Sequence, residues 1–199
     1  MNRNLFQRLV LNLHPERYHG HGKRSPFFEG WYFKLIDATE QQRHAIIPGV
    51  SLANKGIGPH AFVQVFDGIC GEAHYIVYPL SEFWAASDAF SLKIGPNCFT
   101  RDTISLDITD ELLTARGELH FTGGAGWPIT LTAPGIMGWY AWVPFMECYH
   151  GVLSFDHHIE GSLTVKGVTH DFTGGRGYIE KDWGQAFPST WLWQQSNHF

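Results

Sequence analysis

The 199-residue sequence has few charged side chains and lacks any long apolar run. Asp, Glu, Lys and Arg make up 17% of it, against about 25% in an ordinary soluble domain. The net charge of −5 gives no reason to expect a nucleic-acid phosphate backbone as a partner. No apolar stretch approaches the roughly 20 residues that a membrane-spanning helix needs. We therefore expect a soluble chain that is at most peripheral to a membrane.

Cysteine is scarce as well. Cys70, Cys98 and Cys148 form neither a disulfide framework nor a metal-ligand spacing. We interpret them as buried thiols in a reducing compartment, which favours the cytoplasm. Residues 1–13 make a poor signal peptide because polar side chains interrupt their apolar residues.

Metal-binding and nucleotide-binding motifs are missing too. The histidines of the segments 19–21 and 157–158 do not form a convincing ligand set, so no metal is expected. The glycine-rich segment 174–177 leads into a strand pattern and not into a helix, which argues against a phosphate loop. No Gly-x-Ser-x-Gly nucleophile motif is present.

Aromatic residues and turn-forming residues are abundant. The sequence holds 15 Phe, 8 Trp and 7 Tyr, together 15% of the chain, besides 22 Gly and 10 Pro. From residue 27 onward, short runs with a period of two alternate with turn signals such as Asp67-Gly68 and Lys166-Gly167. The expected strands are 28–36, 44–52, 60–66, 73–80, 90–94, 103–109, 112–122, 129–132, 150–155, 159–165, 169–173, 176–181 and 191–196. This pattern predicts an all-β antiparallel barrel or curved sandwich.

One short helix is expected before these strands. Leu5, Leu9 and Leu13 recur at helical spacing, and Pro15 ends the pattern. We expect residues 1–17 to be an N-terminal segment whose helix packs over the barrel mouth, with a membrane-surface helix as the alternative. A weaker pattern at 81–88 suggests a helical turn. Residues 18–199 are expected to form the β domain.

Three segments place carboxylates among aromatic residues. In the first, residues 27–34, a strand would put Glu29, Trp31 and Phe33 on one face. Glu29 is then either a buried acid or one half of an ion pair. In the second, residues 138–151, Glu147 lies near His150. Burial would raise the pKa of Glu147 toward working pH, although a hydrogen-bonded core pair is equally open.

The third segment, residues 174–184, carries four polar side chains at alternate positions, from Arg176 to Asp182. These four residues are Arg176, Tyr178, Glu180 and Asp182. On a strand they share one face, and Ile179 and Trp183 lie on the other. Four polar groups cannot sit in a dry core unless they pair. The local pattern taken alone favours a solvent-exposed polar face.

Four segments of this sequence, in this order, resemble the tocopherol cyclase family. They are FFEGWYFK (27–34), WYAWVPFMECYHG (139–151), GGRGYIEKDWG (174–184) and WLWQQSNHF (191–199). The resemblance runs from about residue 18 to the end. It implies that the chain is the first part of a larger, two-barrel protein, truncated at its C-terminus, with a lipocalin-like barrel that holds a long apolar ligand.

The resemblance also implies a chemistry. Tocopherol cyclases protonate the prenyl double bond of a prenylated hydroquinone, and the phenol oxygen captures the resulting cation to close a chromanol ring. This step needs an acid in a dry pocket and aromatic faces beside the cation, and it needs no cofactor. The expected partner is a small, apolar, prenylated substrate. Two alternatives stay open: a non-catalytic carrier of isoprenoids, and a hydratase or isomerase of an isoprenoid alkene.

The candidate site residues follow from these segments. The candidate acids are Asp182, Glu180, Glu147 and Glu29. The candidate substrate-binding residues are Trp31, Trp139, Tyr140, Trp142, His150, Tyr178, Trp183, Trp193, Asn197 and His198. If the barrel is lipocalin-like, we expect Asp182 to face its interior or rim, and at least one of Trp31, Trp139 and Trp183 to line a cavity.

The cysteines are expected to carry no chemistry. Replacement of Cys148 by Ala or Ser should leave any activity within about tenfold, apart from a stability cost of the size usual for core changes. Activity and thermal unfolding of the two variants test this. Loss of turnover in a variant that keeps its stability would contradict it.

Overall fold

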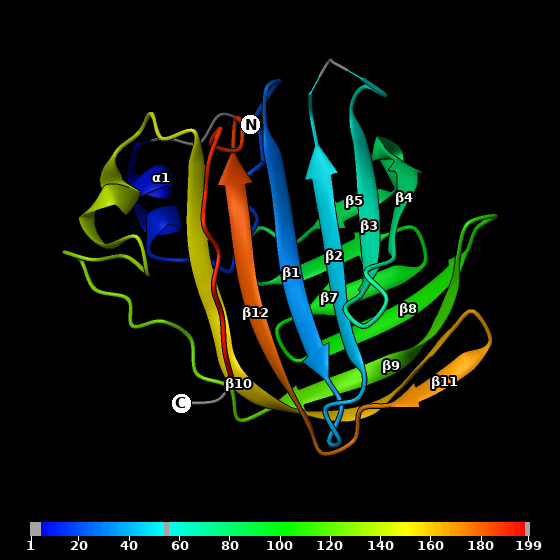
Figure 1. Cartoon of the computed structure of the whole chain (residues 1–199). Coiled ribbons are helices and arrows are strands. Elements are labelled where there is room, and N and C mark those ends of the chain that lie inside the picture. Colours follow the sequence, from blue (N-terminus) through cyan, green and yellow to red (C-terminus); the bar gives the residue numbers. More distant parts are fainter. Residues whose placement is uncertain (1–4, 54–55, 198–199) are drawn as a thin grey trace.

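The computed structural model describes residues 5–53 and 56–197, which form one long antiparallel sheet with a single α-helix beside it (Figure 1). The sheet order is β4-β3-β2-β1-β12-β10-β9-β8-β7-β6-β5, and β11 pairs with β10. The elements are α1 (Leu5–Asn12), β1 (Phe28–Ile36), β2 (Arg43–Ser51), β3 (His60–Asp67), β4 (Ala73–Pro79), η1 (Leu80–Glu82), β5 (Phe83–Ala85), β6 (Ser91–Ile94), β7 (Asn97–Thr100), β8 (Thr103–Thr109), β9 (Thr114–Thr122), η2 (Gly138–Trp142), β10 (Cys148–Val165), β11 (Val168–Asp171) and β12 (Gly175–Gly184). The all-β expectation is confirmed.

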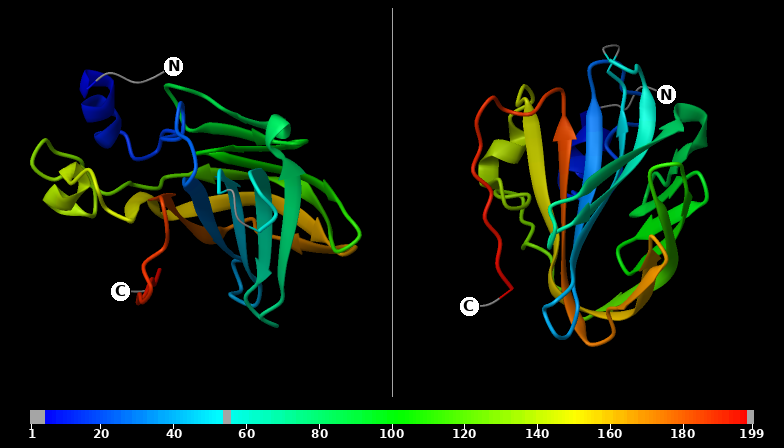
Figure 2. Two further views of the ribbon diagram at one scale, coloured as in Figure 1. Left: turned by 90° about the horizontal axis from the view of Figure 1, so that it is seen from above. Right: turned by 45° about the vertical axis from the view of Figure 1, so that its right-hand side comes forward.

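The sheet is open and strongly curved, so that its two halves face each other (Figure 2). The long strand β10 pairs with β12 in one half and with β9 in the other. Two shifts in its register against β12 lie between Val152 and His157, where Asp156 adopts a φ of +50°. Such bulges bend a strand, and here they allow one strand to belong to both halves.

Aromatic and branched side chains fill the space between the halves. On β1 the alternation is regular, and Trp31, Phe33 and Leu35 are fully buried. Trp31 stacks on Phe90 with ring centroids 5.8 Å apart, and Phe33 lies 6.1 Å from Phe99. The face predicted for Glu29, Trp31 and Phe33 is therefore the inner face of the sheet.

Several predicted elements differ from the structure. The strands expected at 150–155 and 159–165 are one strand, because the bulges of β10 absorb the residues between them. Residues 129–132 form no strand among the described residues and contribute only an isolated bridge from Ile129 to Pro134. Residues 191–196 form no strand either, since side chains and not a backbone ladder attach them to the sheet.

The prediction of three buried thiols was wrong for two of them. Cys70 and Cys98 are exposed, and Cys148 is partly buried. Cys70 lies in the turn after β3, which Asp67 shapes by accepting hydrogen bonds from the backbone of Ile69 and Cys70. Cys98 lies on the outer face of β7, between the buried residues Asn97 and Phe99.

A buried ion pair joins β1, β12 and the N-terminal segment. Lys181 and Glu29 are both fully buried, and Lys181 Nζ lies 2.6 Å from Glu29 Oε1. Lys181 also donates to the Arg17 carbonyl at 2.5 Å and to His19 Nδ1 at 2.8 Å. Burial by itself would raise the pKa of Glu29, but Lys181 and His19 hold that pKa below its ordinary value. Glu29 is therefore an ionised carboxylate, as in the ion-pair alternative.

Removal of one partner of this pair should be strongly destabilising. Lys181→Met leaves Glu29 as an uncompensated buried charge, and we expect it to lower the free energy of unfolding by about 3–5 kcal/mol. The double variant Lys181→Met/Glu29→Leu should recover most of that loss, because it removes both charges. Urea unfolding at neutral pH measures both effects. A double variant as unstable as the single one would contradict this role of the pair.

Candidate active site

The outer face of β1, β12 and β10 carries polar side chains from three of the family-like segments. In the paired strands Tyr32 is opposite Glu180, and Asp182 is opposite His150. Residues that pair directly across antiparallel strands lie on the same face of a sheet. The polar face predicted for β12 is thus the outer face, whereas Lys181 and Ile179 point into the core.

Four of these side chains form two neighbouring hydrogen-bonded pairs, here together called the acid cluster: His150 with Asp182, and Tyr178 with Glu180. His150 Nδ1 lies 2.8 Å from Asp182 Oδ1, and His150 Nε2 lies 3.7 Å from Glu180 Oε2. The Tyr178 hydroxyl donates to Glu180 Oε2 at 2.7 Å. Trp193 Nε1 donates to the same oxygen at 3.0 Å. A neutral Glu180 therefore carries its proton on Oε1, because Oε2 already accepts two hydrogen bonds.

The environment of the acid cluster favours bound protons. Burial raises the pKa of Glu180, and hydrogen bonds from Trp193 and Tyr178 offset only part of this increase. Burial would lower the pKa of His150, but the hydrogen bond and charge of Asp182 raise it above its ordinary value. Burial next to Glu180 also raises the pKa of Tyr32 to about 12, so this phenol is neutral near pH 7. The cluster thus combines proton donors with neutral aromatic rings.

The segment after β12 covers the acid cluster. Residues 185–197, here called the strap, run back along β10 and β12 (Figure 1). Lys34 Nζ donates to Gln195 Oε1 at 2.5 Å and to Asn197 Oδ1 at 3.1 Å. The Trp193 ring meets Tyr32 edge-on at 5.6 Å. As a result Tyr178 and Glu180 are buried although they lie on the outer face.

The structure brings together some of the predicted site residues and separates others. His150, Tyr178, Glu180, Asp182, Trp193 and Asn197 gather on the outer face, whereas Glu29, Trp31 and Trp183 lie on the inner face. Trp139, Tyr140, Trp142 and Glu147 belong to the excursion between β9 and β10. His198 lies outside the described residues. No measurement assigns a role to any of these residues, so their roles stay predictions.

Three expectations about the acids were wrong in their geometry. Asp182 does not face the interior, because the alternation of β12 sends Lys181 and Trp183 inward and Asp182 outward. The local pattern also suggested that the polar face of β12 is exposed to solvent. This is wrong for Glu180, which the strap buries. Glu147 was expected to be buried, but its side chain is exposed. It precedes the first residue of β10, so the alternation of that strand does not point it into the core.

Four further residues were not predicted from the sequence. Tyr32 and Lys34 contact the strap on the outer face, and Lys181 and His19 form part of the buried ion-pair network. The alternation in β1 contained the signal for Tyr32 and Lys34, which share one face of that strand. For Lys181 the signal was its position between Ile179 and Trp183, which point inward. No local pattern marks His19 as the partner of Lys181, which is 162 positions away.

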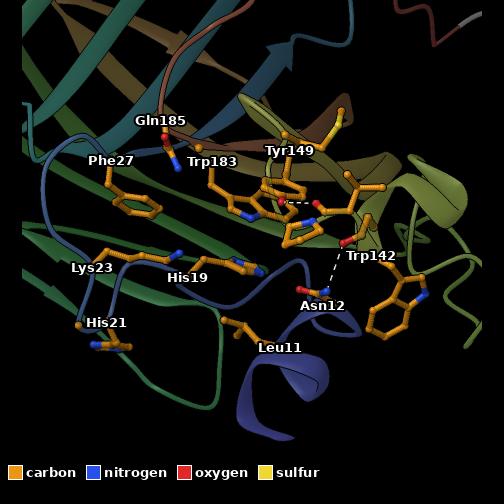
Figure 3. Close-up of a pocket in the computed structure, with 16 residues that line it drawn as sticks. Leu11, Asn12, His19, His21, Lys23, Phe27, Trp142, Tyr149, Trp183 and Gln185 are labelled. Carbon is orange, nitrogen blue, oxygen red and sulfur yellow. Dashed lines mark hydrogen bonds between the residues drawn. The ribbon is translucent and has the colours of Figure 1, made fainter. Parts of the chain in front are cut away.

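A cavity lies on the opposite face of the sheet, between α1, residues 19–27, the excursion before β10 and the end of β12 (Figure 3). Its volume is about 220 Å³. Trp183 is part of its wall, so one of the three tryptophans named above does line a cavity. Trp31 lies in the core, stacked on Phe90, and Trp139 is exposed and stacked on Tyr140.

The acid cluster also has the donor types of a metal site. The ligand atoms of His150, Glu180 and Asp182 all lie within 4.8 Å of one another. Metal binding needs deprotonated ligands whose oxygens are free to coordinate, and Glu180 is one of the three residues. Two donors already occupy Oε2 of that group. The arrangement suits proton transfer better than metal coordination.

Comparison with known proteins agrees with this description. Residues 113–199 match the family model described as tocopherol cyclase-like. Two curated chloroplastic relatives are 24% identical over 229 residues: a probable tocopherol cyclase of Oryza sativa subsp. japonica and a tocopherol cyclase of Zea mays. Each match covers 92% of this chain and 49% or 48% of the relative, so the chain spans about half the length of these relatives.

The fold has a counterpart among solved structures. The crystal structure of CghA with Sch210972 superposes with a TM-score of 0.50 at 12% identity, over 80% of this chain and 46% of that one. This likeness concerns the fold alone. The sequence matches show that the chain is similar to tocopherol cyclase-like proteins. The structural match supports its open, curved, antiparallel β fold. In the described part of the chain, no helix has the length and apolar character to cross a membrane.

The raised pKa of Glu180 predicts a specific pH dependence of stability. The folded protein holds this proton above pH 4.5, the ordinary pKa of the group, where the unfolded chain releases it. Its stabilising contribution is therefore complete below that pH and is lost as the pH rises through the folded pKa. We therefore compare the free energy of unfolding of wild type with that of Glu180→Gln between pH 4.5 and about 8. As the pH rises over this range, wild type should lose stability relative to the variant, which has no proton to release at this position.

Urea unfolding at a series of pH values measures this difference. Glu160→Gln, an exposed replacement on β10, is the matched control and should run parallel to wild type. A difference between wild type and Glu180→Gln that stays flat, or that grows in favour of wild type with pH, would refute the raised pKa.

Proposed function

We propose that the protein is an enzyme of the tocopherol cyclase type, which closes a chromanol ring in a prenylated hydroquinone by acid catalysis without a cofactor. The observation that carries this proposal is the buried carboxyl group of Glu180. Its pKa is raised, and Tyr32, Tyr178 and Trp193 lie beside it. The family of its relatives supports the same reaction class.

The proposed reaction is an isomerisation in which one proton enters and one leaves. Glu180 Oε1 donates its proton to the prenyl double bond, and a tertiary carbocation forms. The phenol oxygen of the same substrate attacks this carbon and closes the ring, and its proton returns to the Glu180 carboxylate. The faces of the nearby aromatic rings stabilise the cation. Exclusion of water by the strap prevents capture of the cation as an alcohol.

The other members of the acid cluster adjust the proton of Glu180. Hydrogen bonds from Tyr178 and Trp193 stabilise the carboxylate that remains after donation. His150 is held by Asp182 at 2.8 Å with its second nitrogen 3.7 Å from Glu180. It is therefore placed to stabilise the carboxylate as an imidazolium. In this proposal Asp182 orients His150, and Glu180 is the acid.

The substrate class also suggests where the protein acts. A prenylated hydroquinone dissolves in lipid, so contact with a membrane surface would give access to it. The exposed side chains of Phe6 and Leu9 on α1 support such a peripheral contact. We propose a cytoplasmic enzyme with this contact, on the basis of three free cysteines. The two relatives are named chloroplastic.

Incubation of the full-length protein with a prenylated benzoquinol tests the reaction. The expected product is a chromanol of the same mass as the substrate. Glu180→Gln should lower kcat by about a hundredfold or more with unchanged folding. Glu160→Gln, which is exposed on β10, should leave kcat unchanged. Asp182→Asn, Glu29→Gln and Glu147→Gln complete the set of candidate acids.

The outcomes separate the competing functions. A Glu180→Gln variant that keeps its activity while Glu29→Gln or Glu147→Gln loses it would overturn the assignment of the acid. Binding of the substrate without any product would contradict the enzyme and favour the carrier. A product heavier by one water would contradict ring closure and favour the hydratase.

A further inference from the structure

The strap residues 191–197 lie on the outer face of the sheet without joining it as a strand (Figure 1). Trp193, Gln195 and Asn197 contact that face through their side chains, and the residue between each pair is exposed. This alternation is that of an extended chain, in which every second side chain points the same way. Because Gln195 is only two residues from Trp193, a displacement of this segment would also move Trp193 away from Glu180.

Lys34 on β1 holds this segment. Its Nζ donates to Gln195 Oε1 at 2.5 Å and to Asn197 Oδ1 at 3.1 Å. Hydrogen bonds from an ammonium group are stronger than those between neutral groups. Lys34 is half-buried, and burial and the charge of Arg43 lower its pKa. Its burial is therefore unfavourable by itself, and the two amide oxygens of the strap compensate for the lost hydration.

Asn197 connects the same segment to two further strands. Its Nδ2 donates to Asp156 Oδ1 on β10 at 3.0 Å and to the Gly177 carbonyl on β12 at 3.3 Å. Gln195 is attached differently, because its second hydrogen bond, from Nε2 to Asn197 Oδ1 at 3.2 Å, stays within the strap. Loss of Lys34 would therefore leave Asn197 attached but remove the hydrogen bond that holds Gln195 on the sheet.

The position of the strap matters for the proposed reaction because water competes with the phenol. Glu180 is buried where Trp193 covers it. With the strap in place, the phenol oxygen of the substrate attacks the tertiary carbon, and its proton returns to the Glu180 carboxylate. With the strap displaced, a water molecule attacks the same carbon and gives its proton to the same carboxylate. The product is then an alcohol that is heavier than the substrate by one water.

We propose that Lys34 is a positioning residue that determines the product of this reaction: it fixes the strap, and with it Trp193, over Glu180 and so excludes water from the cation. The proposal rests on the proposed function, since a choice of product requires that the reaction take place. Its first half, the position of the strap, concerns the protein alone and is tested without substrate.

Hydrogen exchange of the Trp193 indole N–H tests the position of the strap. This N–H donates to Glu180 Oε2 at 3.0 Å, so its exchange reports the opening of the strap. Lys34→Met keeps the apolar stem and loses the charged donor, and we expect exchange at least about tenfold faster than in wild type. Lys34→Arg keeps a charged donor and should stay within about twofold of wild type. Lys93→Met, at an exposed position on β6, is the matched control and should exchange like wild type.

The products that the full-length protein forms from a prenylated benzoquinol test the second half. Wild type should form the chromanol, which has the mass of the substrate. In Lys34→Met the ratio of alcohol to chromanol should rise at least about tenfold, because water reaches the cation. Lys34→Arg and Lys93→Met should keep the wild-type ratio. A merely structural role of Lys34 would lower the amount of folded enzyme without a change in this ratio.

Two further measures keep the test independent of folding. Thermal unfolding and the indole N–H signal of Trp31, which lies in the core, report whether each variant has its native fold. Gln195→Ala removes the partner of Lys34 from the strap and leaves β1 unchanged. It should accelerate the exchange of Trp193 and raise the ratio of alcohol to chromanol, as Lys34→Met does.

Two results would overturn this proposal alone. Wild-type exchange of Trp193 in folded Lys34→Met and Gln195→Ala would mean that Lys34 does not position the strap, whichever reaction the protein catalyses. Faster exchange with an unchanged ratio of alcohol to chromanol would mean that the strap does not determine the product. A wild-type protein that forms no chromanol would overturn the proposed function, and the role in product choice with it, while the exchange rates would still decide whether Lys34 positions the strap.

Discussion

The pairing register of β1, β12 and β10 is the constraint on which the other features of the molecule depend. Side chains alternate along each strand, so the register decides which residues of three separate segments meet on which face. Trp31 pairs with Lys181, Tyr32 with Glu180 and His150 with Asp182. A shift by one residue would move Lys181 to the outer face and Glu180 into the core. Both buried networks would then be lost together.

Buried carboxyl groups on the two faces of these strands are stabilised in different ways. On the inner face, Glu29 and Lys181 are both charged and neutralise each other, and the backbone of the N-terminal segment supplies further hydrogen bonds. On the outer face, Glu180 has no cation of equal strength beside it. Its charged form is therefore disfavoured, and its pKa rises. On β12, Lys181 of the ion pair is thus adjacent to Glu180, a carboxyl group with a raised pKa.

The sequence predicted the parts of this arrangement that depend on local alternation. The strands, the shared face of Glu29, Trp31 and Phe33, and the separation of Glu180 from Ile179 all follow from a period of two. It could not show what covers each face. Glu180 is buried because Trp193 of the strap covers it and donates a hydrogen bond to its side chain. A contact of this kind leaves no periodic pattern in the sequence. The ion pair between Glu29 and Lys181 likewise joins residues that are far apart in the sequence.

The role proposed for Glu180 requires that its carboxyl group keep its proton above the ordinary pKa of a glutamate. The most direct measurement is an NMR titration of the Glu180 side-chain carboxyl carbon in the folded chain, assigned with Glu180→Gln. The account predicts a midpoint clearly above 4.5, the ordinary pKa of a glutamate. A midpoint at or below that value would mean that Glu180 is an ordinary carboxylate, and it would contradict its role as the proton donor.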